Sequence, residues 1–403
     1  MFEGLPLLPS DPILGLSVAF RDDPNPNKVD LGVGVYRNDA GETPIMAAVR
    51  AAEQERLRRE TTKAYTFPAG YPGANDAANV LLLGADHPAL TAARVHSIQT
   101  PGGCGALRVA AELIVRARPQ ARVWVSNPSW ANHVPLLGGA GLALEEYPYY
   151  DYANHCLDFE AMFAALTKVP AGDVVLFHAS CHNPSGADLS PSQWQQLTDL
   201  ALERGFVPLI DSAYQGLGQG LDEDAFGPRL MAEHLPEVIV ASSFSKNFGL
   251  YRDRAGALTL VSTNPTQSLA AHSQLLSVTR GLYSMPPAHG SAIVDIILNS
   301  PELKQQWQDE LAHMRTRIQG LRKSLVEALA KHLPERDFSF IARERGMFSF
   351  LGLSETQVQR LRTEFSLYMT DNSRINVAGL TDSALDYVAQ SIARVLQGAD
   401  RNP

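Results

Sequence analysis

The sequence of 403 residues contains few cysteines, no surplus of positive charge and no long apolar stretch. Its three cysteines, Cys104, Cys156 and Cys181, are widely spaced, so we expect neither a disulfide framework nor a metal site. A reducing cytoplasm is the natural setting for such a chain. The net charge of −9 disfavours a nucleic-acid partner, because non-specific affinity for nucleic acids comes from a basic surface that neutralises phosphates.

No run of about 18 apolar residues occurs, so we expect no helix that spans a membrane. The opening segment MFEGLPLLPSDP has an acid at position 3 and three prolines, and it lacks the basic start and apolar core of a signal peptide. The composition, 45% hydrophobic and 19% charged, is ordinary for a globular protein. The expected partners are therefore small molecules. Anionic ones would be bound through local arginines.

The chain is too long for one ordinary core, which predicts a large domain with a smaller one. Residues 1–43 are predicted to form an N-terminal arm and part of the small domain, since five prolines among the first 26 residues prevent a long helix. Such an arm often packs on another subunit, and a loosely ordered terminus is the alternative. Residues 44–308 are assigned to the large domain and 309–403 to the small C-terminal domain. Strands are expected in that C-terminal domain at 338–341, 347–351 and 374–378.

The middle of the chain alternates near-continuous apolar strands with helices, which is typical of an α/β fold with a parallel sheet covered on both faces. The predicted strands span residues 123–126, 173–178, 206–210 and 237–241. Ligands in such sheets bind beyond the carboxyl ends of the strands. Polar or aromatic residues follow each of these ends, namely Trp130, Asn183, Asp211 with Tyr214, and Lys246. We therefore predict one shared site at this edge of the sheet.

Lys246 lies just past the last of these strands, in a segment rich in serine and arginine. A desolvated lysine can form a Schiff base with a carbonyl, as in enzymes that use pyridoxal phosphate. Ser243, Ser245 and Arg254 could then hold an anion such as a phosphate. A surface lysine on a loop between strands is an equal alternative when this stretch is taken alone.

Two glycine-rich stretches bear on the choice of cofactor. Residues 100–108 open an amphipathic helix, and glycines at a helix start let backbone N–H groups approach an anion. Gly32 and Gly34 are two residues apart, but Arg37 stands where the dinucleotide fingerprint requires its third glycine. We therefore reject a nicotinamide dinucleotide site.

Nine short motifs, spread from position 11 to position 379, carry a resemblance to a known family. They are DPILGL (11–16), LGVGVY (31–36), TPGGxGALR (100–108), SNPSW (126–130), CHNPSG (181–186), DSAYQG (211–216), SKNFGLYxxRxG (245–256), PPAHG (286–290) and RINVAG (374–379). In these motifs the chain resembles class I pyridoxal-phosphate aminotransferases of the aspartate and aromatic amino acid group. The resemblance implies their fold, an aspartate aminotransferase-like transferase fold in which a large cofactor-binding domain has a mostly parallel seven-stranded sheet and the small domain is α+β.

The same resemblance implies roles for individual residues around pyridoxal 5'-phosphate. Lys246 corresponds to the lysine that forms the Schiff base and shuttles the proton, and Asp211 to the carboxylate that pairs with the pyridinium nitrogen. Tyr214 and Asn183 would contact the phenolic oxygen of the ring, and Trp130 would lie on its face. The phosphate would be held by Gly103, Cys104, Ser243, Ser245 and Arg254, with Tyr65 reaching it from the neighbouring subunit of a homodimer with shared active sites.

Substrate binding is implied in the same way. Arg374 corresponds to the arginine that grips the substrate α-carboxylate, where a bidentate guanidinium suits a planar carboxylate. Arg280 corresponds to the arginine that the other subunit supplies to the distal carboxylate of aspartate or glutamate, with a surface salt bridge as the alternative. Gly34, Trp130 and Asn183 complete the expected substrate contacts. His178 and His182 are expected to be hydrogen-bonded supporting residues instead of catalysts.

The sequence departs from the family pattern at several positions that bear on selectivity. Cys104 replaces a hydroxyl residue of the phosphate site, and residues 66–69 differ from the usual loop. Ala64 and Met285 are apolar where aspartate-selective members carry asparagine, whereas Val35 and Thr43 are as in those members. We therefore expect a cytoplasmic aminotransferase that moves an amino group between an aspartate- or aromatic-type amino acid and 2-oxoglutarate. A specialised amino donor, a lyase or decarboxylase on the same fold, and a non-catalytic relative are the alternatives.

Overall fold

The computed structural model describes residues 2–7 and 12–399, so Asp11 of the DPILGL motif lies outside the described residues. Two compact units account for the chain: residues 44–316 form the large unit, and residues 1–43 with 317–403 form the small unit. These units divide at 43/44 and 316/317, whereas the domain boundaries expected from the sequence are 43/44 and 308/309. The difference arises because the helix α12 (Pro301–His332) runs without interruption through both positions.

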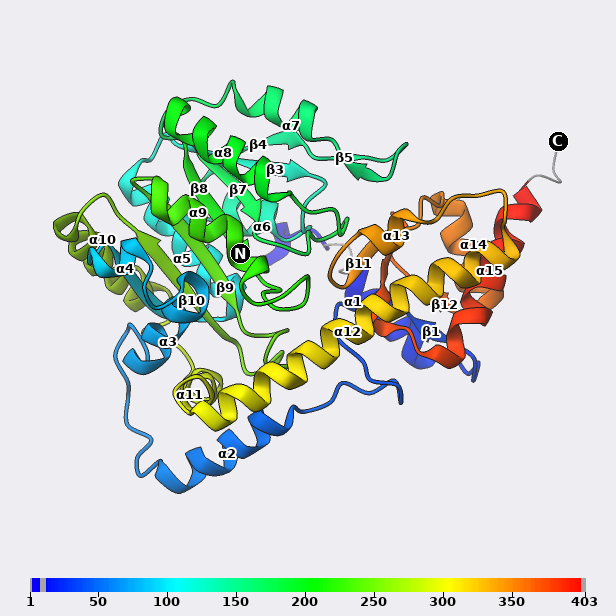
Figure 1. Cartoon of the computed structure of the whole chain (residues 1–403), viewed down its shortest axis with the longest axis horizontal. Helices are drawn as coiled ribbons and strands as arrows, with labels where there is room; N and C mark the ends of the chain where they lie inside the picture. Colours follow the sequence, from blue (N-terminus) through cyan, green and yellow to red (C-terminus); the bar gives the residue numbers. More distant parts are fainter. Residues whose placement is uncertain (1, 8–11, 400–403) are drawn as a thin grey trace. The chain divides into compact units, whose positions relative to one another are not determined.

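The large unit contains a central sheet with helices on both faces (Figure 1). Its strands are β2 (Val95–Pro101), β3 (Arg122–Asn127), β4 (Ala143–Pro148), β5 (Tyr150–Asp151), β6 (Cys156–Leu157), β7 (Val174–His178), β8 (Val207–Ser212), β9 (Val238–Ser243) and β10 (Ala255–Val261). Its helices are α2 (Ala47–Arg59), α3 (Pro72–Leu83), α4 (Pro88–Thr91), α5 (Gly102–Ala117), α6 (His133–Gly138), α7 (Phe159–Leu166), α8 (Pro191–Arg204), η2 (Glu223–Ala225), α9 (Phe226–His234), α10 (Pro265–Leu282), α11 (Ala288–Leu298) and the first half of α12.

The central sheet has seven strands in the order β2-β10-β9-β8-β7-β3-β4, and the prediction of a mostly parallel seven-stranded sheet is confirmed. Neighbouring strands from β9 to β4 pair in parallel, while β10 is antiparallel to both of its neighbours. Strand β7 is buried along its whole length, as an apolar strand covered on both faces must be. Leu176 on one face packs in a cluster with α5, and Phe177 on the other contacts Trp194 of α8.

Local sequence signals explain why the connecting helices begin and end where they do. Helix α8 starts at a capping box, in which the Ser190 hydroxyl accepts from the backbone N–H of Gln193 and the Gln193 side chain bonds back to the Ser190 N–H. Pro191 occupies its first turn, and Gly205 ends it with a left-handed φ of 73°. These signals set the length of the connection between β7 and β8. The two strands pair in parallel, so both of them end at the same edge of the sheet.

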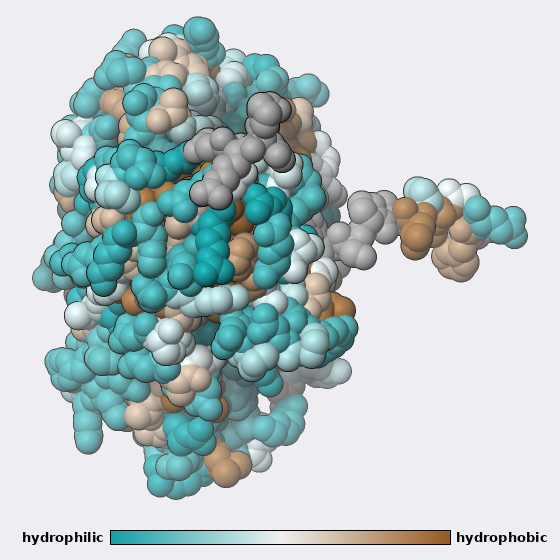
Figure 2. All heavy atoms as spheres, turned by 90° about the vertical axis from the view of Figure 1, so that its right-hand side faces the viewer, coloured by the Kyte–Doolittle hydropathy of each residue, from teal (hydrophilic) through white to brown (hydrophobic). Residues whose placement is uncertain are grey.

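The small unit draws its core from both ends of the chain. Its elements are η1 (Phe2–Gly4), α1 (Pro12–Asp22), β1 (Val29–Asp30), the second half of α12, α13 (Phe340–Arg343), β11 (Phe348–Phe350), α14 (Glu355–Phe365), β12 (Leu367–Tyr368), β13 (Arg374–Asn376), η3 (Val377–Gly379), η4 (Asp382–Ala384) and α15 (Leu385–Ala399). Val29 and Asp30 pair in parallel with Leu367 and Tyr368, which ties the N-terminal segment to the C-terminal half. The α+β character expected of this part is therefore present. The side of the molecule shown in Figure 2 is mostly hydrophilic.

The strand predicted at 338–341 is wrong, because α13 begins there at Phe340. Phe340 and Ile341 are adjacent in sequence and both buried, which a helical turn allows and a half-buried strand does not. The side chain of Asp337 accepts from the backbone N–H of Ser339 and favours the turn. A short aromatic run gave no periodicity that could distinguish the two conformations.

Candidate active site

Lys246 lies in the loop that follows β9, at the carboxyl edge of the parallel strands. Its Nζ atom is 5.2 Å from the centroid of the Tyr214 ring, over the ring face. Burial lowers the pKa of Lys246 below its ordinary value, although the nearby charge of Asp211 opposes that effect. The side chain is therefore a partly buried amine near a carboxylate. The alternative of a surface lysine, which the sequence left open, does not apply to Lys246.

Asp211, near the end of β8, is buried and accepts a hydrogen bond of 3.0 Å from Nε2 of His133. Burial alone would raise the pKa of this carboxyl group, but the hydrogen bond from His133 and the charges around it bring the pKa below its ordinary value. His133 is itself fully buried at the start of α6. The site therefore holds a buried negative charge that is hydrogen-bonded to a buried histidine.

A chain of hydrogen bonds fixes the tautomer of His133. The backbone N–H of Asn183 donates to Nδ1 of His178, so the Nε2 atom of a neutral His178 carries the proton and donates to Ser129 Oγ at 3.2 Å. Ser129 then donates to Nδ1 of His133 at 2.8 Å, which leaves the Nε2 proton of His133 for Asp211. Burial holds the pKa of His178 well below its ordinary value, in agreement with the neutral form.

The other residues that are predicted to contact the cofactor ring lie near Asp211 and Lys246. Asn183 Nδ2 donates to the Tyr214 hydroxyl at 3.5 Å, and the Trp130 ring meets the His133 ring edge to face, with centroids 5.2 Å apart. The His182 ring stacks on the Tyr149 ring, with centroids 3.9 Å apart, and its centroid lies 4.1 Å from that of His178. The structure thus brings together Lys246, Asp211, Tyr214, Asn183 and Trp130, all of which the sequence pattern placed at one edge.

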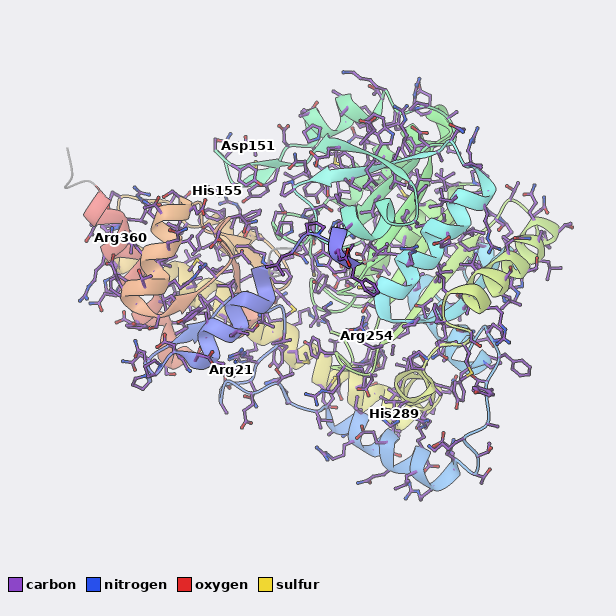
Figure 3. The ribbon with its side chains drawn as sticks, turned by 180° about the vertical axis from the view of Figure 1, so that it is seen from behind. Arg21, Asp151, His155, Arg254, His289 and Arg360 are labelled. Atoms are coloured by element: carbon purple, nitrogen blue, oxygen red, sulfur yellow. The ribbon has the colours of Figure 1, made fainter. Side chains whose placement is uncertain are left out.

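A second cluster surrounds the N-terminus of α5 and is suited to an anion. Arg254 Nη1 donates to Ser245 Oγ at 3.5 Å, and the backbone N–H of Ser245 donates to Ser243 Oγ at 3.3 Å. A Cβ atom on Gly102, whose φ is +68°, would lie 2.6 Å from Nη2 of Arg254, so only glycine lets the helix end approach the guanidinium. Figure 3 labels Arg254 in the large unit, in the loop that leads into β10.

The chemistry of this cluster fits a phosphate group. It combines a positive helix end, an arginine and two hydroxyls, which are the donors that bind phosphate in proteins. Cys104 lies in the first turn of α5, with its sulfur 3.9 Å from Asn132 Nδ2, so a thiol stands where a hydroxyl donor was expected. Gly103, Ser243, Ser245 and Arg254 therefore lie around this helix end, and their contacts with a phosphate stay a prediction.

Two predicted residues of the large unit lie apart from these clusters. Tyr65 is 92% exposed in the loop after α2. Arg280, in the last turn of α10, is also exposed and donates to the Ser284 hydroxyl. Met285 lies beside the same loop, with its sulfur 3.8 Å from the Thr66 hydroxyl. In this single chain, Tyr65 and Arg280 are thus surface residues.

Arg374 and Gly34 belong to the small unit. Arg374 is buried on β13 and donates from Nη2 to the carbonyl of Gly32 at 2.7 Å. Its guanidinium carbon lies 4.4 Å from the centroid of the Phe348 ring. A Cβ atom on Gly34 would lie 2.8 Å from the Cζ atom of the same ring, so Gly34 and Arg374 are both in contact with Phe348.

The sequence analysis missed His133, Ser129 and Phe348. The first two gave no periodic signal, because Ser129 lies in the loop of the SNPSW motif and His133 begins the short helix α6. Phe348 gave no signal, because an aromatic residue in a short strand is usually part of the core.

Within residues 2–7 and 12–399, no group of three or more His, Cys, Asp or Glu side chains could hold a metal ion. In the same described part, no helix is both long and apolar enough to cross a bilayer.

Comparison with known proteins identifies the family. The family model for aminotransferases of class I and II matches residues 26–392. The aspartate aminotransferase of Escherichia coli (strain K12) is 48% identical over 396 residues, which cover 98% of this chain and all of that protein. The aromatic-amino-acid aminotransferase of Pseudomonas aeruginosa is 49% identical over 396 residues, which cover 98% of each chain.

A solved structure of the aromatic-amino-acid aminotransferase from Burkholderia pseudomallei, covalently bound to pyridoxal phosphate, is also similar. It superposes with a TM-score of 0.96 at 45% identity and covers 98% of this chain and 99% of that one. The chain therefore belongs to the class I and II aminotransferase family. It is a pyridoxal-phosphate-dependent aminotransferase, as the amine, the carboxylate and the anion cradle already suggested.

Proposed function

We propose that this enzyme transfers the amino group of an aspartate- or aromatic-type L-amino acid to 2-oxoglutarate, in a site built around Lys246. The observation that carries the proposal is the position of the Lys246 amine beside Tyr214 and within the field of Asp211. Pyridoxal phosphate, when bound, supplies a carbonyl carbon that accepts the amino group and an aromatic ring that accepts electrons. The large unit, residues 44–316, would be the cofactor-binding domain.

Each side chain then has one task. Lys246 would hold the cofactor through Nζ, and its free amine would be the base that takes the proton from the substrate Cα. The lowered pKa of Lys246 favours this step, since a general base must be neutral near the working pH. Asp211, held as a carboxylate by its hydrogen bond from His133, would pair with the ring nitrogen of the cofactor and keep that nitrogen protonated. Tyr214, oriented by Asn183, would donate to the phenolic oxygen of the cofactor, and Trp130 would pack on the face of the cofactor ring.

The phosphate would be held by the cradle at α5, and the substrate by two arginines. Arg374 binds the α-carboxylate that every amino acid carries, with Gly34 lining the same side. Arg280 binds a distal carboxylate when the substrate has one. Ala64 and Met285 make the adjoining surface apolar, which suits an aromatic side chain. The similar identity to an aspartate enzyme and to an aromatic-amino-acid enzyme supports a site that accepts both kinds of donor.

The exposed aromatic residues of the large unit support a homodimer. Tyr65 is 92% and Phe67 74% exposed, and they line a hollow of about 620 Å³ together with Tyr71 and Met285. Large apolar side chains gathered around a hollow are typical of a surface that a partner covers. A second copy would cover them and would bring Tyr65 to the phosphate and Arg280 to the substrate of its partner. Light scattering of the purified protein tests this, since a monomeric active enzyme would contradict it.

The scarcity of cysteine supports a cytoplasmic location, which cell fractionation tests. A second candidate, a specialised amino donor, is favoured by residues 66–69, where the loop departs from the family pattern and exposes Phe67. A panel of amino donors, each supplied with 2-oxoglutarate, distinguishes the two. Preference for aspartate and aromatic amino acids supports the first candidate, and a single unrelated donor supports the second.

The decisive variant for the reaction itself is Lys246→Ala. We expect it to bind cofactor through the phosphate cradle and to lose turnover almost completely, because the variant removes the amine that lies beside Tyr214 and would move the proton. The measurement is oxo-acid production together with the absorbance of the bound cofactor. Retention of full activity would contradict the central role of Lys246.

A further inference from the structure

The contact between Arg374 and Phe348 arises from the register of two short strands in the small unit. β11 and β13 are antiparallel, with Phe348 opposite Asn376 and Phe350 opposite Arg374. Phe348 and Arg374 are therefore diagonal neighbours on one face, a separation that aromatic and long side chains can span. The guanidinium lies over the ring at 4.4 Å, and both residues are buried. Because the pair is removed from water, a cation over the face of this ring is held more firmly than at an exposed site.

The ring of Phe348 has no room to move away from the guanidinium. A Cβ atom at Gly34 would come within 2.8 Å of its Cζ atom, so the ring edge already touches the backbone there. That backbone is fixed, since Asn376 Nδ2 donates to the carbonyls on either side of Gly34 at 2.7 and 2.8 Å. The ring is thus wedged between a fixed segment of main chain and the side chain of Arg374.

The main chain of Phe348 is held from the opposite face of β11 by Arg322, which is 1% exposed in the second half of α12. Successive side chains of a strand point to opposite faces, so Ser349 faces Arg322 while Phe348 faces Arg374. Arg322 donates to Ser349 Oγ at 2.7 Å and to the carbonyl oxygens of Phe348 at 2.6 Å, Gly346 at 2.8 Å and Ile341 at 2.8 Å. Its charge is balanced by the buried carboxylate of Glu344 at 3.7 Å. A buried arginine with this many partners fixes the segment that leads into β11.

We propose that Phe348 is a positioning residue for Arg374: its ring holds the guanidinium in the orientation that receives the substrate α-carboxylate, and Arg322 holds the strand that carries the ring. The inference rests on the proposed role of Arg374. An arginine that is already oriented loses less side-chain freedom when it forms a bidentate pair with a carboxylate. Since both the amino acid and the oxo acid carry that carboxylate, the effect of Phe348 falls on both substrates and does not depend on their side chains.

The test is Phe348→Leu, which keeps an apolar side chain and removes the ring face. We expect KM to rise about tenfold for both the amino acid and 2-oxoglutarate, the order expected for a desolvated cation–ring contact. We expect kcat and the absorbance of the bound cofactor to stay as in the wild type, because the lost interaction stabilises the bound substrate and the transition state equally. Phe338→Leu is the matched control, because Phe338 lies in the core of the same unit and contacts Phe340. That variant should lower the melting temperature without changing KM.

Two further variants separate the possible outcomes. Arg374→Lys should raise KM for both substrates; if it does not, the proposed role of Arg374 fails, and this inference with it. If Arg374→Lys raises KM while Phe348→Leu leaves KM unchanged or lowers only kcat, positioning by Phe348 is refuted and the role of Arg374 stands. Arg322→Lys should raise KM less in the Phe348→Leu background than in the wild type. Fully additive effects would refute the link between Arg322 and Phe348.

Discussion

The anion cradle makes a quantitative prediction at Gly102. Alanine there would adopt a left-handed backbone conformation, since φ is +68°, at a cost of about 1–2 kcal/mol in stability. The new Cβ atom would also lie 2.6 Å from Arg254 Nη2 and force the guanidinium away from the end of α5. A lost charge-assisted hydrogen bond to phosphate is worth about 1.5–3 kcal/mol. At about 1.4 kcal/mol per factor of ten, Gly102→Ala should bind cofactor about 10- to 150-fold more weakly.

Gly41→Ala provides the control for backbone strain alone. Gly41 has a similar φ of +76°, and a Cβ atom there would meet nothing within 4 Å. Both variants should lose comparable stability in denaturant unfolding of the apoenzyme, whereas only Gly102→Ala should lose cofactor affinity. The assay is a titration of the apoenzyme with the amine form of the cofactor, which cannot attach covalently to Lys246. Equal cofactor affinity in both variants would refute the assignment of Arg254 and the α5 terminus to the phosphate.

Two other measurements test the site. Arg280→Ala should reduce kcat/KM for aspartate by at least tenfold more than for phenylalanine, because only aspartate has a distal carboxylate; equal losses, measured with 2-oxoglutarate as acceptor, would reject its role. His178 has a pKa well below that of an unfolded histidine, about 6.5, because it is buried, so the unfolded chain binds more protons as the pH falls below that value. The free energy of unfolding should therefore decrease from pH 7.5 to pH 5, and this decrease should be smaller in His178→Asn; an identical pH dependence in the two proteins would contradict it.

The parts of the site that follow parallel strands could be predicted from sequence. Asp211 pairs with His178 on one side and with Ala241 on the other, so three strands end together and carry Asn183, Asp211 and Lys246 to one edge. The topology rule for such sheets requires only that the strands be recognised. Their roles toward the cofactor remain predictions, and Lys246→Ala tests that of Lys246.

The parts that depend on tertiary contacts could not be predicted. His133 reaches Asp211 because α6 begins there, and a short helix has too few residues to show a periodicity. The turn at Phe340 is favoured by Arg322, which donates a hydrogen bond to the carbonyl of Ile341. The two residues are distant in sequence, so no local pattern shows this contact. The division at 317 lies inside a continuous helix, so no break in composition marks it.

The single reversed strand of the sheet decides where Arg254 can act. β10 runs against β9 and β2, and Ala255 at its beginning pairs with Pro101 at the end of β2. Had β10 been parallel, its seven residues at about 3.3 Å each would have carried the residue before it to the far side of the sheet, roughly 20 Å from the α5 terminus. Because β10 is inverted, the segment that precedes this strand contributes a cation to the carboxyl edge of the sheet, as do the segments that follow the parallel strands. A relative in which β10 ran parallel would need another source of positive charge for its anion.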